Sequence, residues 1–421
     1  MRHLLLLVGL LPLAAASCVG DTPVTPTPGN DASTPDTSTD AVVTPDSASD
    51  SNVEAEAEAG PPPCGAPGET CCLTPLAPCG DGLTCSTGPK KCMVNDAWVV
   101  GEYGTFTNTI VQEIPSAHYD GATWTKQPDV ALDVGVLTSY HAIDAYESPS
   151  AQVRAITSKQ NVSQEWNFNG VVWQECKLGN SCVGPSGKEL YSVISVTNSG
   201  SEEFWLSGLN LMYRCASGAC TQAMTGLPGT FGQGTLAGTT AQDIWYSGLS
   251  SVYRYDGSKW TTTALADAYS IGQQATNDVW VANQQFRHWD GKNWTGPFLA
   301  DGALTPGFVH SISGSGPKDI HACGSDNSGG SFIAHYDGVT WTKKTLPAGV
   351  ANLRRVWAPS PIEAFAVGSK ATLGHTAVIL HWDGVAWTEM PSPNITYSGE
   401  ASGQGGLAWY AVTGRARPRA Q

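Results

Sequence analysis

A short motif, Asp-Gly followed by two further residues and Trp, recurs along this chain and constrains its fold more than any other feature. In the copy at residues 377–388, an apolar strand-like run ends at Asp383-Gly384 and a second run begins at Trp387. Because Asp-Gly favours a tight turn, each copy predicts two antiparallel strands joined by a hairpin. The copies lie roughly 35–50 residues apart, which is the spacing of a repeat architecture. Their turn residues are Asp120-Gly121, Asp256-Gly257, Asp290-Gly291, Asp337-Gly338 and Asp383-Gly384, with a looser copy at Asn169-Gly170 before Trp173 and the most degraded copy at Ser217-Gly218 before Cys220.

A second motif, an acid two residues before an aromatic residue or histidine, lies between successive Asp-Gly copies. It follows Ser-, Gly- and Pro-rich turns and opens a β-prone run, so we expect it to begin the second strand of each repeat. Four antiparallel strands per repeat of about 45 residues define a propeller blade. The copies are Asp96-Ala97-Trp98, Asp144-Ala145-Tyr146, Glu203-Phe204-Trp205, Asp243-Ile244-Trp245, Asp278-Val279-Trp280, Asp319-Ile320-His321 and Glu363-Ala364-Phe365, with a partial copy at Leu407-Ala408-Trp409.

The predicted fold is therefore all-β, a β-propeller of four-stranded antiparallel blades over residues 95–414, with a tail at 415–421. Seven blades are expected and eight are possible. The first repeat begins at its second strand, so a first strand supplied by the C-terminus, near Ile395–Ser398, should complete it and close the ring. This scheme leaves the strand at Trp409 unexplained.

The Asp-x-Trp and Trp-Asp-Gly-x-x-Trp motifs resemble those of kelch-like and other bacterial β-propeller repeats. The chain lacks the regular Gly-Gly pair of true kelch repeats, and its turns lack the residue between Asp and Gly that marks the sialidase Asp box. The resemblance implies a propeller and does not imply a particular activity.

Residues 1–17 read as a secretory signal, with an early Arg2, an apolar stretch and small residues at its end. Cys18 follows directly, so the segment resembles a bacterial lipoprotein signal, although Ala15 stands where Leu is usual. The resemblance implies lipidation of Cys18 and anchoring of an exported protein in a membrane. Since Val19 rather than Asp follows the cysteine, it implies the outer membrane, on the cell surface or the periplasmic face.

Residues 18–63 combine the lipidated cysteine with an acidic Thr, Pro and Ser segment. Nine of the acids of the chain, whose net charge is −15, lie in Val19–Pro63, and this segment holds no Lys or Arg. Large apolar residues are almost absent, so we expect a disordered, extended linker.

Residues 64–92 form a cysteine-rich segment that we expect to hold three disulfides. The absence of His and of CxxC spacing argues against a metal site there. The spacing resembles Dickkopf-type and other knottin-like modules. Two closely spaced pairs further along predict local disulfides, whereas Cys323 aligns with Val100 and Val367 at a small core position. The cysteines expected in disulfides are Cys64, Cys71, Cys72, Cys79, Cys85 and Cys92, and the pairs Cys176/Cys182 and Cys215/Cys220.

Most candidate functional side chains occupy repeated positions, where a structural role is expected. Of the 15 Trp, only Trp166 and Trp357 lie outside the repeat template, and these two are candidate stacking platforms for a ligand. We expect the histidines before the Asp-Gly turns to make structural hydrogen bonds and bind no metal or other cofactor. No nucleophile motif, HExxH or Gly-rich phosphate loop is present, so no catalytic residues are assigned. These histidines are His118, His288, His335 and His381, with Arg254 at the same place in another repeat.

The composition narrows the function to a few hypotheses. An acidic chain without a basic stripe argues against nucleic acid as a partner. The leading hypothesis is a monomeric, non-enzymatic envelope lipoprotein, attached to the membrane by its lipid, whose propeller binds a protein or polysaccharide. The alternatives are a carbohydrate-active enzyme (a glycoside hydrolase or lyase) on a propeller scaffold and an envelope-assembly scaffold.

Overall fold

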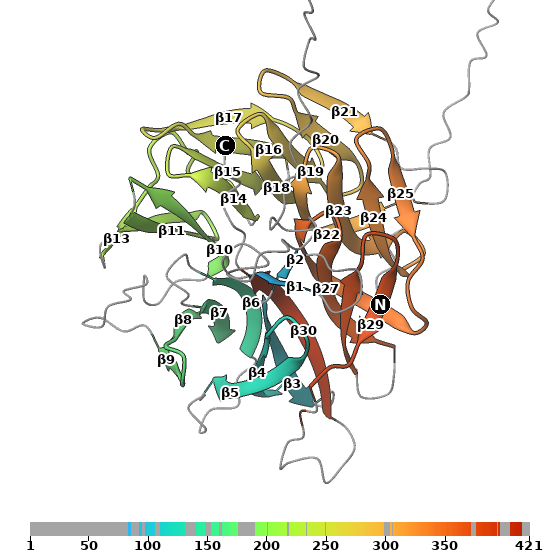
Figure 1. Cartoon of the computed structure of the whole chain (residues 1–421). Coiled ribbons are helices and arrows are strands. Elements are labelled where there is room, and N and C mark those ends of the chain that lie inside the picture. Colours follow the sequence, from blue (N-terminus) through green and yellow to red (C-terminus); the bar gives the residue numbers. More distant parts are fainter. Residues whose placement is uncertain are drawn as a thin grey trace, which may run out of the picture. The chain divides into compact units, whose positions relative to one another are not determined.

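The computed structural model shows seven four-stranded antiparallel sheets and one two-stranded hairpin, all composed of strands (Figure 1). Within the described part of the chain, no helix has the length and apolarity that a bilayer crossing requires. The structure describes residues 83–85, 92–94, 97–105, 110–130, 140–147, 153–159, 162–175, 190–199, 201–216, 219–232, 234–248, 250–298, 304, 306–371, 376–393, 395 and 405–414.

Each large sheet is one propeller blade, and we number the blades in chain order by their second strands. The strands of blades 1 to 3 are β30 (Gly405–Gly414), β3 (Ala97–Thr105), β4 (Ile110–Tyr119) and β5 (Trp124–Val130); β6 (Tyr140–Glu147), β7 (Val153–Lys159), β8 (Val162–Phe168) and β9 (Trp173–Glu175); and β10 (Leu190–Asn198), β11 (Ser201–Gly208), β12 (Leu211–Ala216) and β13 (Ala219–Gln222).

Blades 4 to 7 follow the same order without interruption. Their strands are β14 (Leu236–Thr240), β15 (Asp243–Gly248), β16 (Ser251–Tyr255) and β17 (Trp260–Ala264); β18 (Ser270–Ala275), β19 (Asp278–Ala282), β20 (Phe286–Trp289) and β21 (Trp294–Phe298); β22 (Pro306–Gly316), β23 (Asp319–Asp326), β24 (Ser331–Tyr336) and β25 (Trp341–Lys344); and β26 (Val350–Ser360), β27 (Glu363–Lys370), β28 (Ala377–Trp382) and β29 (Trp387–Met390).

The first strand of each blade contacts the first strand of the next, so the seven blades form a closed ring. Ring closure joins the two ends of the repeat array, because β30 pairs antiparallel with β3 and lies beside it in Figure 1. The predictions of an all-β propeller, of seven blades and of a C-terminal closing strand are therefore confirmed.

Two sequence assignments are wrong in detail. The closing strand is β30 around Trp409, and Ile395 lies outside any strand although its side chain is buried against blades 1 and 7. The motif Asp144-Ala145-Tyr146 lies in β6, the first strand of blade 2, whereas the second strand is β7. In both cases the local motif could be recognised in the sequence. The position of a strand within its sheet, however, depends on which other strand it pairs with.

Aromatic side chains form the core between the blades. In six blades the residue before the turn pairs directly with the aromatic after it, as Tyr255 does with Trp260, and the two rings pack against each other. The second-strand aromatic of the preceding blade packs onto this pair; Trp205 lies 4.9 Å from the Tyr255 ring, and Trp280 lies 4.6 Å from that of Tyr336. Most of the repeated Trp residues are thus inter-blade core, as the repeat positions predicted.

The interface between blades 2 and 3 departs from this pattern on both sides. Arg154 occupies the second-strand position that holds an aromatic residue or histidine elsewhere, and its guanidinium lies 3.7 Å from the centre of the Phe204 ring. The aromatic pair is replaced by a disulfide between Cys215 and Cys220, the pairing predicted from their spacing. In blade 3 a disulfide therefore joins the third and fourth strands at the position where the other six blades have packed aromatic rings.

Candidate functional site: the acid, base and aromatic clusters of the blades

Blades 3, 4 and 5 each place an acid, a base and an aromatic residue together at one end of the second and third strands. The acid lies at or near the start of the second strand, the aromatic residue follows two positions later, and the base faces that aromatic residue from the third strand. In blade 4, Asp243 accepts hydrogen bonds from Arg254 at 2.8 Å and from the Trp245 indole at 3.1 Å.

Blade 5 builds the same unit with histidine as the base. His288 Nε2 lies 2.8 Å from Asp278 Oδ1, and the Trp280 indole donates to that oxygen at 3.1 Å. The imidazole also stacks on Trp280, with ring centres 4.5 Å apart. In these two blades the indole and the base each donate to a buried carboxylate oxygen, which offsets the cost of its burial.

Blade 3 shows how strongly such a carboxylate is held in its charged form. Burial acts to raise the pKa of Glu203, but hydrogen bonds from Arg214 and Asn198 outweigh it, and the net shift is downward. Arg214 makes two bonds to Glu203, at 2.7 and 2.6 Å, and the same bonds raise the pKa of the guanidinium. The unit is a structural ion pair.

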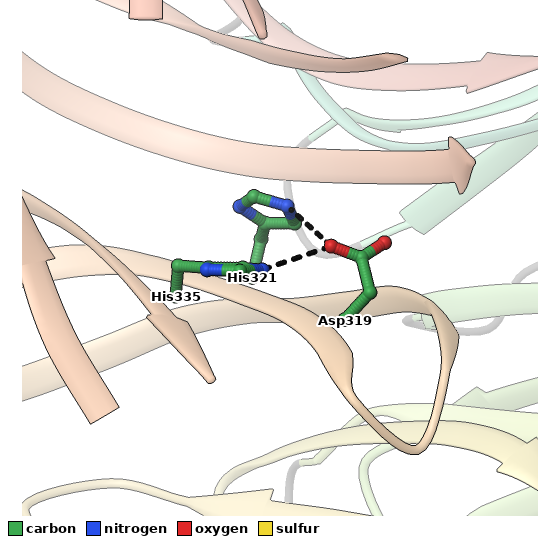
Figure 2. A group of neighbouring side chains, drawn as sticks. All are labelled: Asp319, His321 and His335. Carbon is green, nitrogen blue, oxygen red and sulfur yellow. Dashed lines mark hydrogen bonds and ion pairs between the residues drawn. The ribbon is translucent and has the colours of Figure 1, made fainter. Parts of the chain in front are cut away.

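Blade 6 departs from this unit, because His321 stands where the matching positions of blades 3, 4 and 5 carry Trp. His335 Nε2 lies 2.9 Å from Asp319 Oδ1, and His321 Nε2 lies 3.3 Å from the same oxygen. Figure 2 shows both imidazoles converging on that single oxygen of Asp319. The three potential ligand atoms all lie within 4.8 Å of one another.

The electrostatics of this cluster favour a charged carboxylate and a neutral imidazole. Burial acts to raise the pKa of Asp319, but the contacts of His321 and His335 and a hydrogen bond from Ser315 lower it on balance. Burial lowers the pKa of His321, whose side chain is fully inaccessible to solvent. Neither ring nitrogen of His321 makes a hydrogen bond within the described part of the chain.

The predicted hydrogen bonds of the repeated histidines are present at His288 and His335, whose partners are the acids of the second strand. In blade 7 the contact is longer, with His381 Nε2 lying 3.8 Å from Glu363. The convergence of His321 with His335 was missed by the sequence reading, which assigned no metal ligands. The available signal was the histidine at a position held by Trp in neighbouring repeats.

A second group of functional side chains lies on the first strands of the blades, near their beginnings. The pairing register skips one residue in blades 3, 6 and 7, and in the closing strand of blade 1, which marks a β-bulge. In blade 5 the residue before β18, Tyr269, donates its backbone N–H to the carbonyl of Ala282, which is also the pairing partner of Ser270. Since a bulge redirects a side chain, these positions are suited to a binding role. They are Tyr191, His310, Arg354, Tyr410 and, in blade 5, Tyr269.

Four of these side chains are linked across blades 5, 6, 7 and 1. Tyr269 packs on Phe308 with ring centres 4.5 Å apart, and Phe308 lies 5.1 Å from His310. His310 Nδ1 donates to the backbone carbonyl of Leu353 at 2.7 Å, and the guanidinium of the next residue, Arg354, lies 5.3 Å from the Tyr410 ring. Arg354 is exposed and the aromatic rings are half-buried. We call these five residues (Tyr269, Phe308, His310, Arg354 and Tyr410) the inner-strand cluster.

The two tryptophans proposed as stacking platforms lie in other surroundings. Trp166 is 5% exposed and packs in the core between blades 1 and 2, so it presents no open ring face. Trp357 is half-buried and stacks on Phe365 at a centroid distance of 6.1 Å. Neither belongs to the inner-strand cluster.

The remaining cysteine assignments fall mostly outside the described residues. Cys18, Cys64, Cys71, Cys72, Cys79, Cys176 and Cys182 lie there, so lipidation and these disulfides stay predictions. The hairpin of β1 (Leu83–Cys85) and β2 (Cys92–Val94) places the backbones of Cys85 and Cys92 opposite each other. Cys323 is fully buried as a free thiol, and burial raises its pKa to about 12.

The fold and these clusters define the chain as a seven-bladed β-propeller. No family model and no curated protein matches it. Similar solved structures include a catalytically inactive virginiamycin B lyase from Staphylococcus aureus with quinupristin, at 16% identity, 63% of this chain, 94% of that chain and a TM-score of 0.47.

Two further solved structures are similar at the same level. One is YCF48 bound to D1 peptide, at 12% identity, covering 72% of this chain and 91% of that chain with a TM-score of 0.45. The other is the Aleuria aurantia lectin with Fucα1-6GlcNAc, at 13% identity, covering 62% of this chain and 97% of that chain with a TM-score of 0.40. Likeness this distant concerns the fold alone, so the function has to be argued from the side chains of this chain.

Proposed function

We propose that this chain is an exported envelope lipoprotein whose propeller is a non-catalytic binding module for a polysaccharide. The observation that carries the binding function is the inner-strand cluster. It combines half-buried aromatic rings with a neutral imidazole and an exposed guanidinium, on strands from four different blades.

The chemistry of this cluster suits a sugar chain. Aromatic faces stack on the apolar faces of sugar rings, while guanidinium and imidazole groups bond to hydroxyl or carboxylate oxygens. Burial lowers the pKa of His310 more than its hydrogen bond to the Leu353 carbonyl raises it, and Arg354 lowers it further. The neutral ring that results donates through Nδ1 and presents Nε2 as an acceptor.

The acids give less support to an enzyme. Glu165, Glu203 and Asp243 each form an ion pair with an arginine of their own blade, at 2.7, 2.6 and 2.8 Å. A glycoside hydrolase needs two carboxyl groups flanking one bond, one of them holding a proton. Glu203 and Asp243 occupy the repeated second-strand position, whereas Glu165 lies on the third strand of blade 2. The three acids belong to three different blades, and each is paired with its own base.

The test is a glycan array and a pull-down from envelope extract, both with the purified full chain and three variants. Tyr410→Ala and Arg354→Ala should each weaken polysaccharide binding by about 10-fold or more, since each removes a contact worth roughly 1–3 kcal/mol. Val385→Ser changes a valine that is 82% exposed at a third-to-fourth-strand turn, and should bind like the parent.

Three outcomes of this test would contradict the polysaccharide proposal. Capture of one protein partner, lost in Tyr410→Ala, with no glycan bound would favour the protein-ligand or assembly-scaffold hypothesis. Release of reducing sugar from a bound glycan would favour the enzyme. Equal glycan binding by all the variants would place the site elsewhere.

The membrane anchor is tested separately from the ligand. We propose that Cys18 carries the lipid, as the signal sequence implies, so Cys18→Ser should move the protein from the membrane fraction to the soluble fraction. A variant that still sediments with membranes at the level of the parent would show that the anchor is not Cys18.

A further inference from the structure

We propose that Asp319, His321 and His335 of blade 6 form a binding site for a divalent transition-metal ion of the Zn²⁺ type. The site is separate from the inner-strand cluster, because its residues lie at the opposite ends of the strands, beside the first-to-second-strand turn. The proposal rests on the spacing of the three ligand atoms, on the burial of His321 and on the contrast with the other blades.

The spacing of the ligand atoms fits a metal ion. Ligands about 2.0–2.2 Å from a tetrahedral Zn²⁺ lie roughly 3.3 Å from one another. The carboxylate oxygen of Asp319 lies 2.9 Å from His335 Nε2 and 3.3 Å from His321 Nε2. The two imidazole nitrogens lie within 4.8 Å of each other. An ion would be seated among the three atoms by side-chain shifts that bring these nitrogens to the tetrahedral spacing.

The burial of His321 calls for a partner that the blade does not otherwise provide. A polar ring in a core costs free energy unless its nitrogens are bonded. His321 is fully buried among Trp382, Trp387 and His335, and its Nε2 approaches Asp319 without the geometry of a hydrogen bond. A metal ion would use the Nε2 lone pair and so give this buried ring the partner that it lacks.

Blade 5 supplies the comparison, because it has the same acid and histidine but cannot offer a third ligand. There Trp280 occupies the position of His321, and its indole donates to Asp278. Oδ1 of Asp278 accepts from that donor and contacts His288, while Oδ2 is buried without a hydrogen bond in the described part of the chain. Substitution of Trp by His in blade 6 exchanges one N–H donor for a nitrogen lone pair, which is the change that a metal site requires.

The surroundings of Asp319 and the types of ligand limit which metal ions would suit the site. Ser315 donates to Oδ2 of Asp319 at 2.6 Å, which orients the carboxylate with Oδ1 toward the histidines. Two imidazoles and one carboxylate suit Zn²⁺, Co²⁺ or Ni²⁺ better than Ca²⁺ or Mg²⁺, which prefer oxygen ligands. The side chain of His335 is 15% exposed, so water can complete the coordination from that side.

The experiment titrates the full chain, stripped with a chelator, with Zn²⁺ by calorimetry and with Co²⁺ by visible absorption. We expect one Zn²⁺ per chain at this site, a Co²⁺ spectrum with nitrogen and oxygen ligands, and a rise in the thermal midpoint on adding metal. His321→Phe, which installs the residue of the matching position in blade 7, should weaken binding at this site by more than about 100-fold, beyond the loss caused by outer-shell changes.

A matched control separates the metal site from the repeated structural unit. His288→Gln changes the corresponding histidine of blade 5 and should leave Zn²⁺ stoichiometry and affinity unchanged. The proposal is overturned if the parent binds no Zn²⁺ or Co²⁺ at millimolar concentration, or if His321→Phe binds with the stoichiometry and affinity of the parent. A parent whose thermal midpoint ignores metal, beside a more stable His321→Phe, would show that His321 has only a packing role.

Discussion

At the scale of the residue, the identity of the second-strand side chain decides what each acid, base and aromatic unit can do. With Trp, the indole and the base both bond to the same oxygen of a buried carboxylate, as in blades 4 and 5. With His321 at this position, the unit gains a nitrogen lone pair, and neither ring nitrogen of His321 is hydrogen-bonded within the described residues. With Arg154 at this position, the guanidinium forms an ion pair with Glu165 of its own blade and lies over the ring of Phe204 in the next blade.

Removing the charge of Glu203 tests the structural role of these pairs. Glu203→Gln leaves Arg214 without its two charge-assisted bonds, so we expect the free energy of unfolding to fall by about 1–3 kcal/mol. The midpoint of denaturant unfolding measures the effect. Glu389→Gln is the control, because the Glu389 side chain is 36% exposed whereas that of Glu203 is 3% exposed, so loss of its pair with Lys370 should change stability by less than about 1 kcal/mol. Equal effects of the two substitutions would contradict a buried structural pair.

At the scale of the element, the turn between the third and fourth strands is the most uniform part of the repeat. The Asp carboxylate accepts hydrogen bonds from the backbone N–H groups two and three residues later, as Asp383 does from Val385 and Ala386 at 2.9 and 2.8 Å. The following glycine has a positive φ, 93° at Gly384. This conformation is open to glycine and costly for other residues.

Alanine at two of these glycines separates backbone strain from crowding. Gly170 has φ 91°, and no described atom lies within 4 Å of the place that an alanine methyl would take, whereas at Gly384 the methyl would meet Ile362 at 3.0 Å. Strain alone predicts a loss of about 1–3 kcal/mol for Gly170→Ala. Gly384→Ala should lose more, so thermal midpoints should fall in the order parent, Gly170→Ala, Gly384→Ala. A neutral Gly170→Ala would refute the strain argument.

The same turns predict how stability depends on acid. Backbone hydrogen bonds from Lys259, then bonds from Ser258, lower the pKa of Asp256 to about 2. Because the folded pKa lies below the unfolded value of about 3.9, the stabilisation is complete above that value and is lost as the pH falls toward 2. Carboxyl NMR titration should report the low pKa, and Ser258→Ala should raise it. The pKa of Asp326 is also about 2, but Ser328, Gly330 and Lys343 lower it, so Ser258→Ala should leave this pKa unchanged.

At the scale of the whole molecule, closure depends on one strand from the far end of the chain. Trp409 and Val412 of β30 are buried with Phe365 and Ile379 of blade 7, while the backbone of β30 pairs with β3 of blade 1. The closing strand therefore joins blade 7 to blade 1 through both side chains and hydrogen bonds. Without it β3 would become an unpaired edge.

Truncation tests closure directly. Deleting residues 405–421 should cause unfolding or aggregation at a much lower temperature, since one strand's contacts are comparable with the roughly 5–15 kcal/mol stability of a domain. Deleting only residues 415–421, which follow β30, should be harmless. Calorimetric melting of both chains and the parent distinguishes a ring from an open solenoid, in which losing the last strand would merely trim an end. Three matching melting curves would refute closure.

The repeat motifs by themselves determined the blade fold and most of the core, and they favoured seven blades while leaving eight possible. Asp-Gly turns and the paired aromatics around them act over a few residues, so their chemistry is legible in any one copy. The buried Trp positions follow because a repeated position meets the same neighbour in each blade. The free, buried Cys323 was likewise predictable from its alignment with Val100 and Val367.

The tertiary structure alone decided which strand closes the ring, where Asp144 lies and which side chains meet. β30 and β3 are about 300 residues apart in sequence, and no local signal selects Trp409 over Ile395 as the closing segment. The meeting of His321 with His335 depends on the register of two strands, and the inner-strand cluster depends on bulges in several blades. These features arise from long-range pairing, whose energy is distributed over partners that a linear pattern does not name.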